Sequence, residues 1–219
     1  MFPSRRIAVM GSDKFRDEYS VSFDGTDEYI DCGDSTSWDF DNGSNSKFHI
    51  NIWVKLTAST SSEDSFIGKY DGAANKREWR ISLDGSRNIK CVFSSNGIAT
   101  ASAVTSNALA LNRWYNIGVT YNGSQGTADN RLNIYLDGVW QSKTHTGTLP
   151  AQVNEDDAPL TIGATLDNGA WANLPQGNIS EVAIYNINFG KDTVRTLYND
   201  RDPYNHKEGI ASNNLVAWY

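Results

Sequence analysis

The sequence predicts an all-β fold, a two-sheet antiparallel sandwich with one short helix, and three observations carry this prediction. Asp-Gly and Asn-Gly dipeptides, which suit the positive φ of hairpin turns, each occur four times in the 219 residues. The segments between them alternate apolar and polar side chains, which is the period of a half-buried strand. Only one stretch has helical spacing, so the core must come from packed sheets.

The predicted strands direct their apolar side chains to one face. The longest, residues 47–56, alternates five apolar residues with His49, Asn51, Trp53 and Lys55. In chain order the predicted strands cover residues 47–56, 79–83, 89–93, 115–121, 132–136, 139–142 and 179–187. Strands of this length, joined by tight turns, favour two packed sheets.

The single predicted helix covers residues 191–198 and follows Gly190. Val194, Leu197 and Tyr198 are spaced to form one short apolar stripe, so the helix should pack with that side against a sheet. The polar loops elsewhere are too short to separate domains, and residues 19–219 are therefore expected to form one domain.

The two ends of the chain differ from this pattern. Residues 1–18 are charged and lack any period, so they are interpreted as an N-terminal arm, either a disordered tail or a segment that docks on a neighbouring subunit. About the last 10–15 residues suit either a final strand or a second arm. A signal peptide needs an apolar stretch of roughly 7–15 residues, which the N-terminus lacks, so none is predicted.

Charge and composition exclude two classes of partner. The chain has 19 Lys and Arg against 26 Asp and Glu, a net charge of -7, which disfavours binding to nucleic acid. Its apolar runs are only a few residues long, so no membrane insertion is expected. Cys32 and Cys91 fall on separate predicted strands, where a disulfide and two core thiols both fit, with core thiols favoured.

Five segments in order, with hairpin spacing between them, resemble the laminin-G-like branch of the concanavalin A-like lectin/glucanase superfamily. They are residues 19–30, 48–55, 113–121, 132–138 and 177–186. The resemblance covers most of the chain, from about residue 19 to residue 199, and implies a jelly-roll sandwich.

Enzymatic activity is not expected. Glycoside hydrolysis generally uses two carboxylates at a fixed separation, and the resemblance implies alternating acids on one strand, a pattern that this sequence lacks. Glu155-Asp156-Asp157 is contiguous and lies beside Pro159 in a predicted loop, where a solvated acidic turn explains it. The sequence has no nucleophile elbow, zinc-binding helix or phosphate loop, and its three histidines lack the spacing of metal ligands.

Calcium is a cofactor that the resemblance implies for many members of the family. The corresponding candidates here are Asp24, Asp27 and the residue before Glu181. That residue is Ser180, where family members often carry Asp, so one charged ligand is missing. A purely structural role is the alternative, because Asp24-Gly25 is also a typical turn.

A loop tryptophan marks the predicted ligand-binding surface. Trp171 lies in a predicted loop with Asn168 and Asn173 on either side, where a ring can stack on a sugar and amides can bind its hydroxyls. A plug that packs onto the sheet edge is the alternative. Trp38, near Asp39, is a second candidate of the same kind, whereas the strand tryptophans are expected in the core or on a sheet face.

These observations favour a non-enzymatic adhesion, recognition or structural module that acts outside the cell. A virion (phage) protein, such as a capsid decoration or fibre component, is the main hypothesis. Its partners would be copies of itself in a homo-oligomer, or a capsid, contacted through residues 1–18. A lectin-like domain that binds a glycan is the alternative, and a glycoside hydrolase is the third hypothesis.

Overall fold

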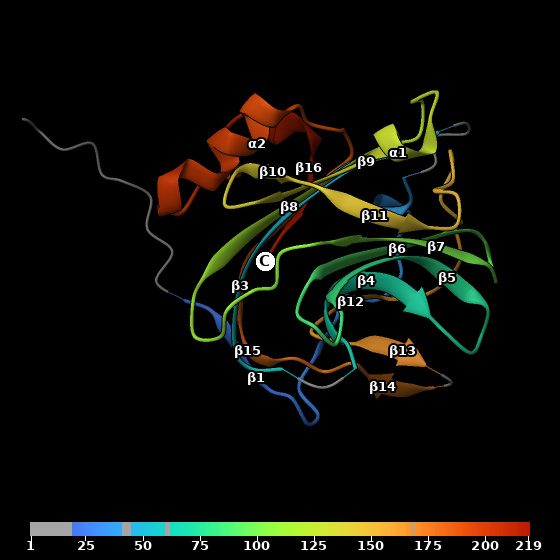
Figure 1. The fold of residues 1–219 in the computed structure, drawn as a ribbon, viewed down its shortest axis with the longest axis horizontal. Coiled ribbons are helices and arrows are strands. Elements are labelled where there is room, and N and C mark those ends of the chain that lie inside the picture. The colour runs from blue at the N-terminus through green and yellow to red at the C-terminus, as the bar shows by residue number, and fades with distance from the viewer. Residues whose placement is uncertain (1–18, 41–44, 60–61, 168) are drawn as a thin grey trace, which may run out of the picture.

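The computed structural model describes residues 19–40, 45–59, 62–167 and 169–219. Over these residues two antiparallel sheets pack face to face, as Figure 1 shows. The predicted all-β sandwich is therefore confirmed. The predicted arm of residues 1–18 lies outside the described residues, as does Asn168.

Sheet A contains the strands on which most of the sequence landmarks lie. Its order is β1, β15, β3, β8, β9 and β10, and β16 also pairs with β15. The bounds are β1 Val21–Asp24, β3 Lys47–Ala58, β8 Tyr115–Asn122, β9 Leu132–Leu136, β10 Val139–Gln141, β15 Gln176–Tyr185 and β16 Leu215–Trp218.

Sheet B forms the other layer, in the order β11, β7, β6, β5, β4, β12 and β2, with the β13–β14 hairpin at its side. The bounds are β2 Ile30–Asp31, β4 Asp64–Asp71, β5 Lys76–Leu83, β6 Ile89–Gly97, β7 Thr100–Thr105, β11 Lys143–Thr146, β12 Leu160–Ile162, β13 Thr165–Asp167 and β14 Ala170–Ala172. Every pairing is antiparallel except the single parallel bridge between β13 and β4.

Short helices complete the structure. The helix α2 covers Lys191–Tyr198, which are the residues predicted from the sequence, and α1 is a single turn at Ala128–Arg131. Three 3-10 turns are η1 Thr36–Trp38, η2 Asn199–Arg201 and η3 Ser212–Asn214. None of the helices in the described part of the chain is long and apolar enough to cross a membrane.

The main core fills the space between the sheets with the side chains that the alternation predicted. The five apolar residues of β3 are all buried there, and Phe48 stacks between Phe40 and Tyr121 at centroid distances of 4.6 and 5.3 Å. Cys91 is buried in this core, Cys32 is half-buried against it, and both are free thiols.

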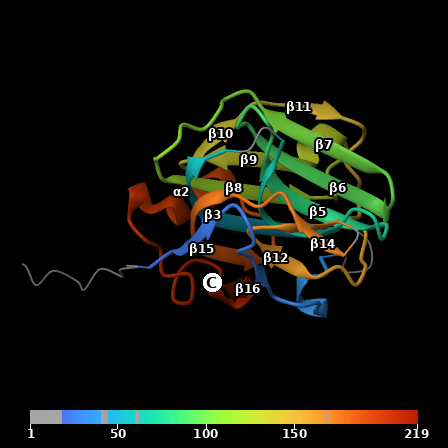
Figure 2. The ribbon, with the colours of Figure 1, turned by 90° about the horizontal axis from the view of Figure 1, so that it is seen from below.

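A second core lies on the outer face of sheet A, under α2 and the C-terminal segment (Figures 1 and 2). It buries Val194 and Leu197 of the α2 stripe, together with aromatic residues of β9, β15 and the following loop, which are Tyr135, Tyr185 and Phe189. The helix can approach because position 118 is glycine, where a Cβ atom would lie 2.9 Å from Val194 Cγ1. Both faces of sheet A are thus covered.

This second core also encloses His49. The side chain points to the polar side of β3, as predicted, but it is 0% exposed, and neither ring nitrogen has a hydrogen-bond partner among the described residues. The Phe189 ring, in the loop after β15, lies 5.0 Å from the His49 ring between centroids, and the Tyr185 ring lies 6.1 Å away. The C-terminal segment packs beside them, because β16 pairs with β15 and Tyr185 Oη lies 2.6 Å from His206 Nδ1 in a hydrogen bond. Residues Leu215–Trp218 of the C-terminal segment thus form a strand, which is one of the two alternatives that the sequence left open.

Burial of the two histidines predicts a loss of stability in acid. Burial lowers the pKa of His49 to about 3 and that of His206 to about 4. The unfolded chain binds these protons below its ordinary pKa of 6.5, whereas the folded chain stays neutral, so the free energy of unfolding falls from about pH 6.5 downward. Each histidine contributes up to about 1.4 kcal/mol per pH unit in that range.

Urea unfolding of the wild type and His49→Leu between pH 7 and pH 4.5 measures this effect. The wild type is expected to lose about 2 kcal/mol more than the variant over that range. Parallel pH profiles for the two proteins would contradict the assignment of a neutral, buried His49.

Candidate functional site

A hollow of about 610 Å³ opens on the outer face of sheet A, at the end of β3 that α2 does not cover. We call it the sheet A hollow. Its wall comes from five separated parts of the chain: the residues just before β1, β3, the segment before β8, β15, and the turn after α2. The lining residues that matter below are Tyr19, Trp53, Arg113, Trp114, Glu181 and Arg201.

Two tryptophans give the hollow apolar surface. Trp53 projects from β3 and stacks on Tyr198 of α2 with a centroid distance of 5.8 Å, so its orientation is held by the helix. Trp114 lies just before β8 and is 37% exposed. The hollow therefore combines one ring that is fixed by packing with another that is open to a ligand.

Charged groups stand beside these rings. Glu181 is 4% exposed, and its Oε2 accepts a hydrogen bond of 3.4 Å from the Tyr204 backbone. Arg113 donates to Asp137 Oδ2 at 3.0 Å, and the Nε of Arg201 donates to Tyr198 Oη at 3.1 Å. The guanidinium groups are thus oriented by partners at the edge of the hollow.

The backbone at the hollow is strained. Glu181 has a φ of 48°, in the irregularity where the register of β15 against β3 shifts between Ser180 and Ala183. Asn199, Asp200 and Arg201 have φ values of 51°, 50° and 80° in succession. Side chains in this left-handed region cost roughly 1–3 kcal/mol each, least for Asn and Asp, and such residues cluster at functional sites.

The loop tryptophan singled out in the sequence has a different setting. Trp171 was predicted in a loop but lies in β14, which pairs antiparallel with β13. Its half-buried ring is 4.0 Å from the Tyr29 ring, between centroids. Asn173 closes the hairpin by donating to Thr165 Oγ1 at 2.8 Å. Both residues thus have packing or hydrogen-bonding roles at the edge of sheet B.

Trp38, the second aromatic candidate, ends η1 and packs against the main core. Its indole nitrogen is buried and has no hydrogen-bond partner in the part of the chain that the structure describes. The ring is partly buried, so most of its apolar surface is used inside the protein.

The residues considered for calcium are divided between two places. Carboxylate oxygens of Asp24, Asp27 and Glu28 lie within 4.8 Å of one another, and such oxygens are the ligands that Ca²⁺ takes. All three side chains are exposed, and Asp24 and Glu28 accept hydrogen bonds from backbone N–H groups of the same turn. Ser180 lies near the other end of β1, where it donates to the Tyr19 carbonyl at 2.9 Å and lines the sheet A hollow.

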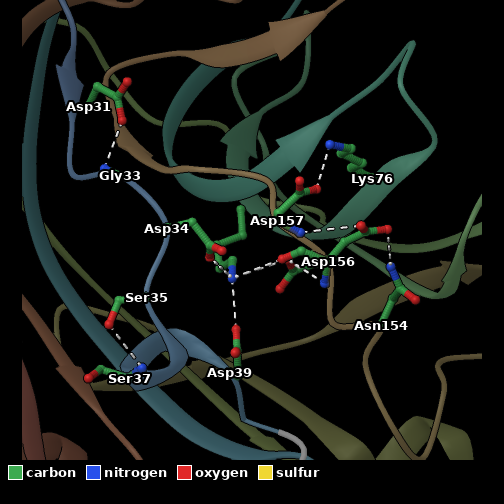
Figure 3. A network of polar contacts seen from close by, with 12 residues as sticks. Asp31, Gly33, Asp34, Ser35, Ser37, Asp39, Lys76, Asn154, Asp156 and Asp157 are labelled. Atoms are coloured by element: carbon green, nitrogen blue, oxygen red, sulfur yellow. Dashed lines mark hydrogen bonds and ion pairs between the residues drawn. The ribbon is translucent and has the colours of Figure 1, made fainter.

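A polar network lies at the edge of the core, where the acidic loop 155–157 meets the segment 31–39 (Figure 3). Asp157 pairs with Lys76 at 2.5 Å, and the Asp156 amide donates to Glu78 Oε1 at 3.1 Å. The sequence predicted a solvated acidic turn here. Asp157 is exposed as expected, whereas the backbone of Asp156 contacts the buried side chains of Glu78 and Lys69.

The sheet A hollow was not found from the sequence. Trp53 is the residue from which the site could have been predicted, because a tryptophan on the polar face of an otherwise amphipathic strand needs a partner or a ligand. Glu181 and Arg201 could not have been recognised from the sequence. Their positive φ values depend on a bulge and on a helix end that no local pattern marks.

Comparison with known proteins places this fold in a family. A laminin-G-type family model, described as the concanavalin A-like lectin/glucanases superfamily, matches residues 24–195. None of the curated protein sequences matches the chain.

Several solved structures share the fold at low identity. A candidate carbohydrate-binding protein from Bacteroides ovatus is 15% identical with a TM-score of 0.62, over 91% of this chain and 50% of that one, so this chain spans about half its length. The carbohydrate-binding module CBM40 of a Ruminococcus gnavus sialidase, bound to α2,3-sialyllactose, is 12% identical with a TM-score of 0.55. The match covers 78% of this chain and 97% of that one. A heptameric pentraxin from Limulus polyphemus is 11% identical with a TM-score of 0.55, and the match covers 82% of this chain and 81% of that one.

The family model covers more than three quarters of the chain and includes nearly all of the five landmark segments. The solved structures described above share the fold, with TM-scores of 0.55, 0.62 and 0.55. This protein therefore belongs to the concanavalin A-like lectin/glucanase superfamily, as a laminin-G-type domain.

Proposed function

We propose that this protein binds a carbohydrate in the sheet A hollow and does not cleave it. The observation that carries the proposal is the meeting of Trp53, Trp114 and Glu181 with two arginines in one concave site. Sugar rings present C–H faces that pack on an indole, and their hydroxyls bond carboxylates and guanidinium groups. The volume of about 610 Å³ lies within the usual range of ligand sites.

The structural relatives support this class of ligand. The Bacteroides ovatus protein is described as carbohydrate-binding, and the Ruminococcus gnavus module is bound to a sialylated sugar. At 15% and 12% identity these likenesses concern the fold. The choice of the hollow as the site depends on the side chains of this chain alone.

Binding without hydrolysis is part of the proposal. Glycosidases generally place two carboxylates about the scissile bond. Among the described residues that line the hollow, Glu181 is the single carboxylate. A site of this composition can orient a sugar but does not supply an acid and a base together.

The virion hypothesis has a different basis. It depended on residues 1–18 as an arm for neighbouring subunits, and these residues lie outside the described part of the chain. None of the relatives described above is a virion component by its description. We therefore propose a glycan as the partner, and a location outside the cell, where glycans are displayed.

A glycan array followed by calorimetric titration of the strongest binder tests the proposal. Trp114→Ala should weaken the affinity at least about tenfold, because it removes the open stacking surface. Trp140→Ala is the matched control: Trp140 is 52% exposed on β10, outside the hollow, and its loss should leave the affinity unchanged.

The same titration separates the hollow from the edge of sheet B. A binder that is lost in Trp171→Ala and retained in Trp114→Ala would transfer the site to the Tyr29–Trp171 pair. An array without any binder, or release of reducing sugar from a bound glycan, would contradict the proposed function itself.

The two tryptophans should also differ in their effect on stability. Trp53→Ala is expected to lower the free energy of unfolding by about 2 kcal/mol, because the ring is half-buried and packs on Tyr198. Trp114→Ala should change it by less than about 0.5 kcal/mol, since the side chain is largely peripheral. Denaturant unfolding measures both values, and equal losses would show that Trp114 is also a packing residue.

A further inference from the structure

Lys69 is a fully buried cation surrounded by oxygen atoms from distant parts of the chain. Its side chain is 0% exposed, and its Nζ lies 2.9 Å from Asp34 Oδ1 and 2.8 Å from Asp39 Oδ1. Glu78 Oε1 and the Asp156 carbonyl oxygen each lie 3.3 Å away. Figure 3 shows Asp34, Asp39 and Asp156 in this polar network. Four oxygens, three of them from carboxyl groups, thus surround one ammonium.

The position of Lys69 in the sheet shows how unusual this cation is. Lys69 lies opposite Trp79 on β5 and opposite Leu160 on β12, both of which are buried in the main core. Cross-strand partners share a face of the sheet, so Lys69 leaves β4 on the core side. A lysine is almost never fully buried unless it is paired.

Lys69 lies in β4, and the oxygens around it come from three other segments of the chain. Asp34 and Asp39 lie on the connection between β2 and β3, Glu78 lies in β5, and Asp156 lies in the loop before β12. The β2–β3 connection and the loop before β12 have little regular structure of their own. The ammonium therefore holds two loops against the end of sheet B.

Three carboxyl groups face the single ammonium of Lys69. Burial would lower the pKa of Lys69, but the attraction of Glu78, Asp39 and Asp34 outweighs it and raises the pKa to about 12. Burial raises the pKa of Glu78 to about 8, against the opposing attraction of Lys69. The geometry of the site thus places one buried ammonium against three carboxyl groups and one backbone carbonyl.

We propose that the Lys69 ammonium is a tethered cation in a site built like a calcium site, and that removing it lets Ca²⁺ bind there. The ligands would be Asp34, Asp39, Glu78 and the Asp156 carbonyl, all hard oxygen donors of the kind Ca²⁺ takes. The space left by the lysine stem would admit water as the remaining ligands. In the wild type, the two loops are held without a metal ion. This inference does not depend on the proposed glycan binding.

Thermal unfolding of the wild type and Lys69→Ala, with chelator or with about 10 mM CaCl₂, tests the proposal. In chelator the variant should melt about 10 °C below the wild type, because buried carboxylates lose their cation. Calcium should raise the melting temperature of the variant by about 5 °C more than that of the wild type. Any calcium binding at Asp24, Asp27 and Glu28 is common to both proteins and cancels in this comparison.

Two controls identify the site. NaCl at matched ionic strength should not reproduce the effect of calcium, and adding Asp39→Asn to Lys69→Ala should reduce the calcium response because it removes one ligand. Calorimetry should find one more bound Ca²⁺ per chain in Lys69→Ala than in the wild type. A calcium response of Lys69→Ala no larger than that of the wild type would overturn the proposal.

If Lys69→Ala does not fold in chelator, refolding yield replaces the melting temperature. A yield of folded protein that rises at least about tenfold with calcium, relative to NaCl, would support the tethered-cation site. An equal yield in calcium and in NaCl would overturn it, since the carboxylates would then not be able to use a metal ion in place of the lysine.

Discussion

The burial of both faces of sheet A is the constraint on which the rest of this structure depends. In a sandwich with one solvated face, β3 and β8 would expose His49, Asn51 and Asn116 to water. Here α2 and the C-terminal segment cover them, and Asn116 donates to Asn51 Oδ1 at 3.1 Å inside the protein. Each fully buried apolar side chain of the covering layer contributes roughly 1.5–3 kcal/mol, which offsets the cost of enclosing these polar groups.

The hollow is a consequence of where this covering layer stops. The α2 helix ends at Tyr198, and the three left-handed residues that follow turn the chain back toward β15. Glu181 meets that turn from the β15 irregularity. Strain of this kind persists only where the surrounding packing determines it. The same packing that buries His49 therefore also holds Trp53, Glu181 and Arg201 in place.

The outer face of sheet A and the end of sheet B are covered through different physical interactions. On the outer face of sheet A the packing is apolar, through Val194 and Leu197 of α2. At the end of sheet B it is electrostatic, through the buried ammonium of Lys69 among carboxyl groups. The apolar packing under α2 leaves the rings of Trp53 and Trp114 available to a ligand. The charged groups at the end of sheet B, in contrast, already pair with one another.

The sequence predicted the features that depend on local periods. The apolar face of β3, the hairpin turns and the bounds of α2 all follow from side chains within a few residues of one another. His49 could not be assigned, because what covers it is an element about 140 residues later in the chain. Lys69 was not singled out and no strand was predicted at β4, since the register that brings Lys69 opposite Trp79 is a property of pairing and not of period. Trp171 was expected in a loop because Asn-Gly marks a turn equally well with or without paired strands on either side.

A crystal structure with a bound glycan, chosen from array binders, tests the central claim most directly. The account predicts that a sugar ring lies against Trp114 and Trp53, with a hydroxyl within hydrogen-bond distance of Glu181. A sugar bound instead at the Tyr29–Trp171 pair or on the outer face of sheet B, with the sheet A hollow unchanged, would contradict it.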